Sequence, residues 1–401
     1  MKIKIDKIVF NSRDIADSGY ISLKSDFTKK QEINIPNSIA YPAFINSHEH
    51  LVGNWYPRTG DNRPYATSDL WVNDMKESKP YLERNKVWIN DGSFNLCTGN
   101  AYLLTTLGVY KNIFSGCNVV QDHASSQEDK YYESFPIFVL KDYRQCHSLS
   151  MGNWWGDKTA EEEWEDTHGK MPFILHLAEG LDENAKADFG NLKKRNLLQP
   201  NTIMIHAIAL TEDEIKDVAK VGASICWCPE SNDFLIGKSI DVPACLKYGA
   251  NVLLGTDSSQ SGSINFFHEI RAAHKMFPQI DLRDIFDMFT KNAQKALFID
   301  EKYGKLTHND NENLLILNKK DDEPMQNLLK VDMEDVKLQI YNGKPIYGDY
   351  EYLSAFDVNP DDYFIFETKG IKKFVIGHPE KIIKIIDSYL GYHKQFPFIP
   401  F

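Results

Sequence analysis

The chain opens with apolar and polar residues in alternation, and this pattern changes near residue 43. Residues 1–10, 20–25 and 32–35 follow a period of two, which predicts three short β-strands. Beyond residue 43, short apolar runs alternate with longer amphipathic segments. The runs typical of strands are residues 118–121, 173–175, 202–205, 223–227 and 251–254. The segments typical of helices are residues 94–113, 181–195, 211–221, 242–248, 266–276 and 282–298.

Strands that alternate with helices predict βαβ units and a parallel sheet. The stretch that shows this alternation, residues 44–303, is close to the size of a complete eight-fold barrel, roughly 250 residues. An open, doubly wound sheet of similar length is the alternative, but no glycine-rich phosphate loop opens any of these units. We therefore predict an α/β protein with a (β/α)8 TIM-like barrel.

Both ends of the chain predict additional β-structure. Residues 313–317 and 336–341 are typical of strands, and residues 342–345 of a hairpin turn. Paired with the N-terminal strands, they would form a small β-sandwich built from both chain ends. The expected organisation is residues 1–43 and 304–349 for the sandwich, 44–303 for the barrel and 350–401 for an ordered C-terminal extension. The extension is too rich in apolar residues to be a disordered tail.

Composition narrows the choice of partners. Hydrophobic residues make up 42% of the chain, and the formal net charge is −12. An acidic surface argues against nucleic acid or an anionic membrane as the main partner. No leader peptide and no apolar run of about 20 residues is present, so we expect a cytoplasmic protein. The six cysteines lack framework spacing and are expected to be reduced thiols. A homodimer is expected only because it is the commonest oligomeric state among soluble oligomers.

Four predicted strands end in side chains that can bind a metal. His48 and His50 follow the apolar run at 44–45, and residues i and i+2 of an extended chain point the same way. His176, His206 and Asp257 follow three later strands. Taken singly, each is more often a packing or capping residue. Together they indicate one site, because the carboxyl ends of barrel strands converge on one mouth.

These segments resemble the amidohydrolase superfamily, in particular the branch of cytosine and guanine deaminases and triazine hydrolases. The similar segments are residues 41–51, 176–179, 206–210, 228–232, 254–257 and 313–317. The resemblance implies one divalent metal, zinc or alternatively iron. The implied metal ligands are His48, His50, His176 and Asp257.

The resemblance also assigns roles in catalysis. Glu179 would shuttle protons, His206 would orient the attacking water or the developing oxyanion, and Asp257 would take the proton of that water. Ser231 and Asn232 match a loop that is usually close to the substrate, although structural packing explains them equally well.

A metal-activated water suits hydrolysis of a small molecule. Bound Zn²⁺ lowers the pKa of water from 15.7 to about 7, and the resulting hydroxide attacks an electrophilic sp² carbon. The leading hypothesis is a deaminase that cleaves a non-peptide C–N bond of an amino-heterocycle or a guanidine-like substrate. The alternatives are an amidase or imidazolone-type ring opener, a dechlorinating hydrolase and, in a different class, a catalytically inactive barrel that acts as a scaffold or binding protein.

Other candidates for the substrate pocket are weaker. His123, His147 and Trp154, with its neighbour Trp155, would line the mouth and stack on a planar substrate. One departure bears on this pocket. Only about 20 residues separate the run that ends near Ser150 from the strand at 173, so we expect the fourth βα unit, near residues 150–172, to be short or missing.

Overall fold

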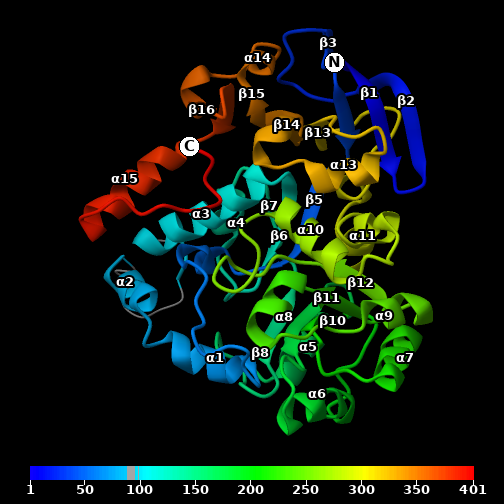
Figure 1. The fold of residues 1–401 in the computed structure, drawn as a ribbon, viewed down its shortest axis with the longest axis vertical. Coiled ribbons are helices and arrows are strands. Elements are labelled where there is room, and N and C mark those ends of the chain that lie inside the picture. The colour runs from blue at the N-terminus through cyan, green and yellow to red at the C-terminus, as the bar shows by residue number, and fades with distance from the viewer. Residues whose placement is uncertain (88–94, 98) are drawn as a thin grey trace.

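The computed structural model describes residues 1–87, 95–97 and 99–401. A barrel occupies the middle of the chain, and a separate sheet lies beside it, with blue N-terminal and orange C-terminal strands side by side (Figure 1). The barrel strands belong to a three-stranded and a five-stranded parallel sheet. They are β5 (Phe44–Glu49), β6 (Cys117–Asp122), β7 (Phe138–Val139), β8 (Arg144–Ser148), β9 (Phe173–Leu177), β10 (Thr202–His206), β11 (Ser224–Trp227) and β12 (Asn251–Leu254). The predicted α/β barrel is confirmed.

The barrel closes where its last strand meets its first. The backbone N–H of Asp257 donates to the carbonyl of His48 at 3.1 Å. Gly255 permits this approach, because a Cβ at that position would lie 2.8 Å from the backbone nitrogen of His48. The glycine therefore brings the ends of β12 and β5, which both carry candidate ligands, into contact.

Helices cover the outside of the barrel. They are α1 (Ser68–Met75), α2 (Lys79–Val87), α3 (Gly99–Phe114), α4 (Asp129–Glu133), α5 (Ala160–Glu165), α6 (Glu183–Lys194), α7 (Glu212–Val221), α8 (Pro229–Ile236), α9 (Val242–Tyr248), α10 (Phe266–Met276), α11 (Leu282–Met288) and α12 (Lys291–Ala296). The predicted helix at 282–298 is wrong in one respect, since it divides into α11 and α12. Within the helix predicted at 94–113, residues 94 and 98 lie outside the described part of the chain.

The short βα unit is not quite where the sequence predicted it. The fourth unit is present, because α5 follows β8 and begins with a capping box at Thr159. It is nevertheless short, with a helix of 6 residues. The unit without a helix is the third, where residues 140–143, all of them described, join β7 directly to β8.

A nine-stranded sheet joins the two ends of the chain, which confirms the predicted β-structure from both ends. Its strands are β1 (Lys2–Asn11), β2 (Asp14–Ser22), β3 (Glu32–Asn34), β4 (Ser38–Tyr41), β13 (Leu314–Asn318), β14 (Val336–Tyr341), β15 (Lys344–Asp349), β16 (Tyr363–Thr368) and β17 (Ile371–Ile376). In β13, Leu314 and Ile316 face one hydrophobic cluster, whereas Leu315 and Leu317 face the barrel-side cluster. Such a strand reads as a continuous apolar run because both of its faces are buried.

The C-terminal extension continues this sheet and then crosses to the barrel. Strand β17 pairs with β15, and α15 (Pro379–Leu390) follows. Ile383 and Ile386 of α15 pack with Leu104 and Leu107 of α3 in one hydrophobic cluster. The remaining short helices are α13 (Pro324–Lys330), α14 (Tyr350–Leu353) and the 3-10 turns η1 (Leu51–Trp55), η2 (Glu301–Tyr303), η3 (Met333–Asp335) and η4 (Pro360–Asp362).

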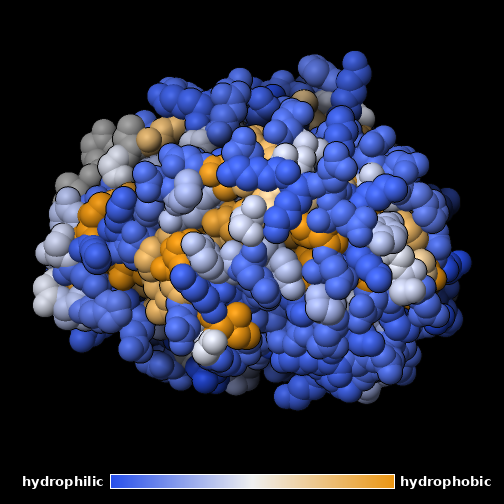
Figure 2. Space-filling model, turned by 90° about the horizontal axis from the view of Figure 1, so that it is seen from above, coloured by the Kyte–Doolittle hydropathy of each residue, from blue (hydrophilic) through white to orange (hydrophobic). Residues whose placement is uncertain are grey.

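The surface seen from above is largely hydrophilic, and its hydrophobic residues lie in several separate patches (Figure 2). Among the described residues, no helix has the length and apolar character needed to cross a membrane. All six cysteines are free thiols, as the sequence predicted.

Candidate metal centre and active site

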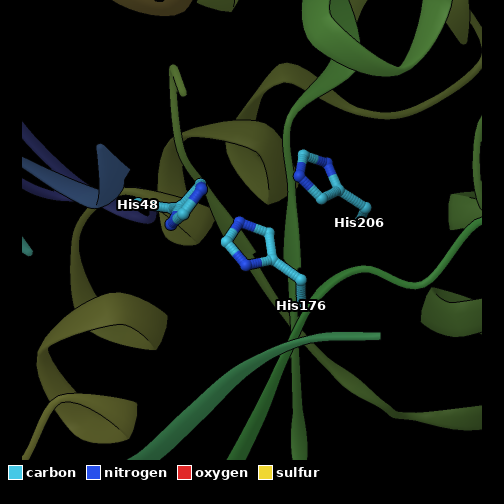
Figure 3. A group of neighbouring side chains, drawn as sticks. All are labelled: His48, His176 and His206. Carbon is cyan, nitrogen blue, oxygen red and sulfur yellow. The ribbon is translucent and has the colours of Figure 1, made fainter. Parts of the chain in front are cut away.

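The candidate ligands meet at the carboxyl end of the barrel strands. His48 lies near the end of β5, His176 in β9 and His206 at the end of β10, and their rings point toward one another (Figure 3). His50 and Asp257 come just after β5 and β12. The Oδ1 atom of Asp257 lies 3.9 Å from Nε2 of His48 and 3.8 Å from Nε2 of His50.

The chemistry of this cluster fits a metal ion. His48 is fully buried, and neither of its ring nitrogens has a hydrogen-bond partner among the residues that the structure describes. A buried polar group without a partner costs roughly 1–3 kcal/mol. Burial, followed by the nearby His50, lowers the pKa of His48 well below its ordinary value, so this imidazole is neutral and its lone pair is available to a cation.

Backbone carbonyls orient two of the candidate ligands. Nδ1 of His50 lies 3.0 Å from the carbonyl of His123, and Nδ1 of His176 lies 2.9 Å from that of His147. A carbonyl oxygen only accepts, so Nδ1 carries the proton in both rings and Nε2 presents a lone pair. Such hydrogen bonds to the second ring nitrogen fix the tautomer that a metal requires.

Hydroxyl groups hold the candidate carboxylate. Oδ2 of Asp257 accepts hydrogen bonds from Ser231 and Ser261, each at 2.8 Å. Burial opposes ionisation of Asp257, but His50 and His48 outweigh it and lower its pKa below the ordinary value. The ionised carboxylate therefore keeps Oδ1 directed at the histidines.

Glu179 and His206 form a proton-sharing pair. Oε1 of Glu179 lies 3.4 Å from Nε2 of His206, and Nδ1 of His206 lies 2.7 Å from Oδ1 of Asn232. The amide oxygen accepts the Nδ1 proton, which leaves Nε2 able to accept one from Glu179. Burial raises the pKa of Glu179, so the carboxyl holds a proton at higher pH than an exposed glutamate does.

Three backbone positions at this end of the barrel are strained. His206, Asp257 and Ala178, which precedes Glu179, have φ angles of 65°, 52° and 53°. Left-handed geometry costs a non-glycine residue roughly 1–3 kcal/mol and is concentrated at functional sites. These turns direct His206 and Asp257 into the mouth of the barrel.

An aromatic cavity of about 380 Å³ opens over the candidate ligands. Its wall includes His123, His147, Trp154 and Trp155, as the sequence predicted for the mouth. The ring of Trp154 stacks on His147 with a centroid separation of 3.5 Å. Pockets of roughly 300–1,000 Å³ accommodate small organic ligands.

Ser231 and Asn232 lie beside the site and contact two of its side chains. Both are buried in α8, where Ser231 contacts Asp257 and Asn232 contacts His206. Neither is part of the cavity wall. Their contact with substrate stays a prediction. In the structure, they orient the side chains of Asp257 and His206.

A buried ion pair next to the site was missed by the sequence reasoning. Nζ of Lys111 on α3 lies 2.9 Å from Oε2 of Glu49 and donates to the carbonyl of Asp257 at 3.0 Å. Oε1 of Glu49 accepts the backbone N–H of His50. The available signal was a charged residue, Lys111, within an apolar helix, and another, Glu49, between two candidate ligands.

Comparison with known proteins gives consistent results. The amidohydrolase family model matches residues 165–346. The 5-methylthioadenosine/S-adenosylhomocysteine deaminase of Teredinibacter turnerae is 23% identical over 358 residues, covering 78% of this chain and 76% of its own length. The aminodeoxyfutalosine deaminase of Deinococcus radiodurans is 32% identical over 107 residues, 26% of each chain.

Two solved structures share the fold. An adenosine deaminase from Xanthomonas campestris with bound zinc superposes with a TM-score of 0.69 at 15% identity, covering 86% of this chain and 92% of its own. Atrazine chlorohydrolase from Arthrobacter aurescens, complexed with zinc, gives a TM-score of 0.66 at 15% identity, with coverages of 86% and 94%.

Proposed function

We propose that this chain, whose residues 165–346 match the amidohydrolase family model, is a metal-dependent deaminase of an amino-heterocycle. The observation that carries the proposal is the Glu179–His206 pair, whose side chains are 11% and 1% exposed and lie 3.4 Å apart, beside the histidine cluster. Proton transfer to a substrate nitrogen needs a carboxyl that is protonated near neutral pH, and burial raises the pKa of Glu179 in that direction.

The residues present fit one divalent metal ion, and zinc is the ion we expect. The residues that would hold it are His48, His50, His176 and Asp257. When bound, the ion supplies a water that is acidic enough to act as a nucleophile at neutral pH. Asp257, ionised in the buried site, is placed to accept a proton from that water.

Glu179 and His206 would handle the remaining charges. Glu179 would first protonate a ring nitrogen of the substrate, then take the hydroxyl proton of the tetrahedral adduct and pass it to the departing amine. The proton that Asp257 took from the water would afterwards restore Glu179. When its Nε2 also carries a proton, His206 would donate a hydrogen bond to the oxygen that becomes the product carbonyl. Asn232 holds its Nδ1 proton, which fixes Nε2 as the atom that faces the reaction.

The cavity favours a planar, partly apolar substrate. Trp71, Tyr81, Trp154 and Trp155 contribute aromatic surface to its wall, and aromatic faces stack well on heterocycles. Of the two named relatives, one is a deaminase of 5-methylthioadenosine and S-adenosylhomocysteine and the other of aminodeoxyfutalosine. We therefore expect an aminopurine nucleoside with a bulky substituent.

Ammonia release tests the proposal. Purified enzyme with zinc is incubated with 5-methylthioadenosine, adenosine, cytosine, guanine and simple guanidines, and ammonia is measured by a coupled assay. We expect turnover of at least one of these compounds, and a loss of about 10²–10⁴-fold in the Glu179→Gln variant with its metal retained. The exposed His308 gives a control, His308→Asn, that should keep full activity.

Two results would contradict the proposal. One is opening of a cyclic amide without ammonia release from any amine, which would make the enzyme an amidase-type ring opener. The other is retention of bound zinc in both the His48→Asn and Asp257→Ala variants, which would mean that the ion is held elsewhere.

A further inference from the structure

A second group of histidines lies beside the candidate metal centre. His123 follows β6 and His147 lies in β8, and each offers a ring nitrogen within 4.8 Å of the others and of His176. The ring centroids of His123 and His176 are 4.6 Å apart, and those of His147 and His176 are 4.8 Å apart. All three residues are buried.

The side chains of His123 and His147 have no hydrogen-bond partners in the described part of the chain. All four of their ring nitrogens are buried and unsatisfied, which is unfavourable for polar groups that water cannot reach. Their backbone carbonyls, in contrast, already orient His50 and His176. A cation that accepts one lone pair from each imidazole would satisfy one nitrogen of each residue.

The fold holds both imidazoles in place. Both side chains are buried, and Trp154, stacked on His147, restricts the orientation of that ring. The pair is therefore preformed, and imidazole nitrogen is a ligand that a borderline divalent cation accepts.

His176 determines how strongly a second ion would bind. Its Nδ1 donates to the carbonyl of His147, so only Nε2 is available, and one lone pair serves one ion. With the first ion holding His176, a second ion has His123 and His147 as its protein ligands and must complete its shell with water. Two neutral ligands bind more weakly than three histidines and a carboxylate.

We propose that His123 and His147 hold a second divalent cation next to the first, that this site fills only when the metal is in excess, and that its occupation inhibits the enzyme. Inhibition follows because both residues line the cavity over the catalytic groups, so the second ion and the substrate occupy the same space. The inhibition rests on the proposed function, whereas binding of the second ion does not.

Metal stoichiometry tests the site directly. Enzyme is dialysed against rising free zinc, and bound metal is counted by mass spectrometry. We expect wild-type protein to hold one ion and then a second at free zinc at least about tenfold higher, because fewer ligands bind it. The His123→Asn/His147→Asn variant should stop at one, since it keeps both carbonyls that orient the first site. His308→Asn should bind two.

Kinetics and fluorescence give independent readouts. In wild-type enzyme, excess zinc should raise KM severalfold with kcat unchanged, and the double variant should show no such rise relative to its own baseline. A second equivalent of Co²⁺ should quench the fluorescence of Trp154 and Trp155, which both lie against His147, a change that is lost in Trp154→Phe/Trp155→Phe. This measurement needs no histidine variant and covers the case in which the double variant does not fold.

The outcomes separate the two proposals. A single ion at every zinc concentration, with no Co²⁺-dependent quenching beyond the first equivalent, would refute the second site and leave the deaminase proposal intact. A second ion that persists in the double variant would also refute it. Turnover without any bound metal would instead contradict the proposed function. The number of bound ions would still decide whether His123 and His147 hold a second cation.

Discussion

Replacing Lys111 by methionine should destabilise the protein more than any surface substitution. Lys111 is 1% exposed, and its Nζ contacts Glu49 at 2.9 Å, the carbonyl of Asp257 at 3.0 Å and Oγ1 of Thr256 at 3.3 Å. Methionine keeps most of the aliphatic stem and removes the charge. The variant therefore leaves the carboxylate of Glu49 buried without its cation.

The magnitude follows from this burial. Removing one partner of a buried ion pair costs roughly 3–5 kcal/mol, because the remaining charge stays desolvated. Typical proteins unfold with about 5–15 kcal/mol, so Lys111→Met should remove a large part of the stability. The loss should reach the metal site as well, since Lys111 supports the backbone of Asp257 and Glu49 accepts from the N–H of His50.

Chemical denaturation of the metal-free proteins measures the effect. The Glu49→Gln/Lys111→Met double variant removes both charges and should recover at least about 2 kcal/mol relative to the sum of the single losses. The matched control is the exposed pair Lys186–Glu183 on α6, at 2.8 Å, where Lys186→Met should cost less than about 0.5 kcal/mol. A loss below about 1 kcal/mol for Lys111→Met, or strictly additive variants, would show that the pair does not behave as a buried ion pair.

Three further predictions follow from individual residues and from the metal. Burial raises the pKa of Glu269 to about 8 from 4.5, so between these pH values the folded state binds more protons than the unfolded state. The free energy of unfolding should therefore fall as pH rises from about 5 to 8, by at most about 1.4 kcal/mol per pH unit. Glu269→Gln should flatten this slope in denaturation curves, and an unchanged slope would contradict the assignment. Gly255→Ala should displace His48 and reduce the zinc content of the protein. Gly190→Ala is the control, because a Cβ there meets nothing within 4 Å, and it should leave the zinc content unchanged. Equal effects of the two substitutions would refute the close approach of Gly255 to His48. Chelation of the first metal ion should lower the melting temperature, and added zinc should restore it. A ligand present at a thousandfold excess over its Kd stabilises the folded state by about 4 kcal/mol. A thermal unfolding transition that does not respond to the chelator would argue against a stabilising ion.

Local signals in the sequence predicted the features that depend on neighbouring residues. Thr211 and Glu214 have capping-box spacing, and both hydrogen bonds of that box are present at the start of α7. Asn342 and Gly343 have φ angles of 47° and 75°, as a two-residue hairpin turn requires. The ends of the barrel strands were also readable, because each buried strand is a short apolar run followed by a polar residue.

Features that depend on contacts between residues far apart in the sequence could not be predicted from it. Glu49 and Lys111 are 62 positions apart and meet only because α3 packs behind β5, which no local period encodes. The absence of a helix from the third βα unit could not be predicted for a different reason. Strand β7 has only 2 residues, too few to show a period of two, so the sequence predicted the short fourth unit but not the direct connection from β7 to β8.

The same limit explains why the role of the backbone carbonyls of His123 and His147 could not be predicted. From the sequence they were candidates only for their side chains, yet the structure shows that each has two separable parts in the site. The carbonyl of each residue holds a candidate ligand, His50 or His176, and any amino acid except one that distorts the backbone preserves that contact. The imidazoles face the cavity with unsatisfied nitrogens. Because the two parts can be varied independently, side-chain substitutions there change what the cavity binds while the tautomers of the first metal site remain fixed.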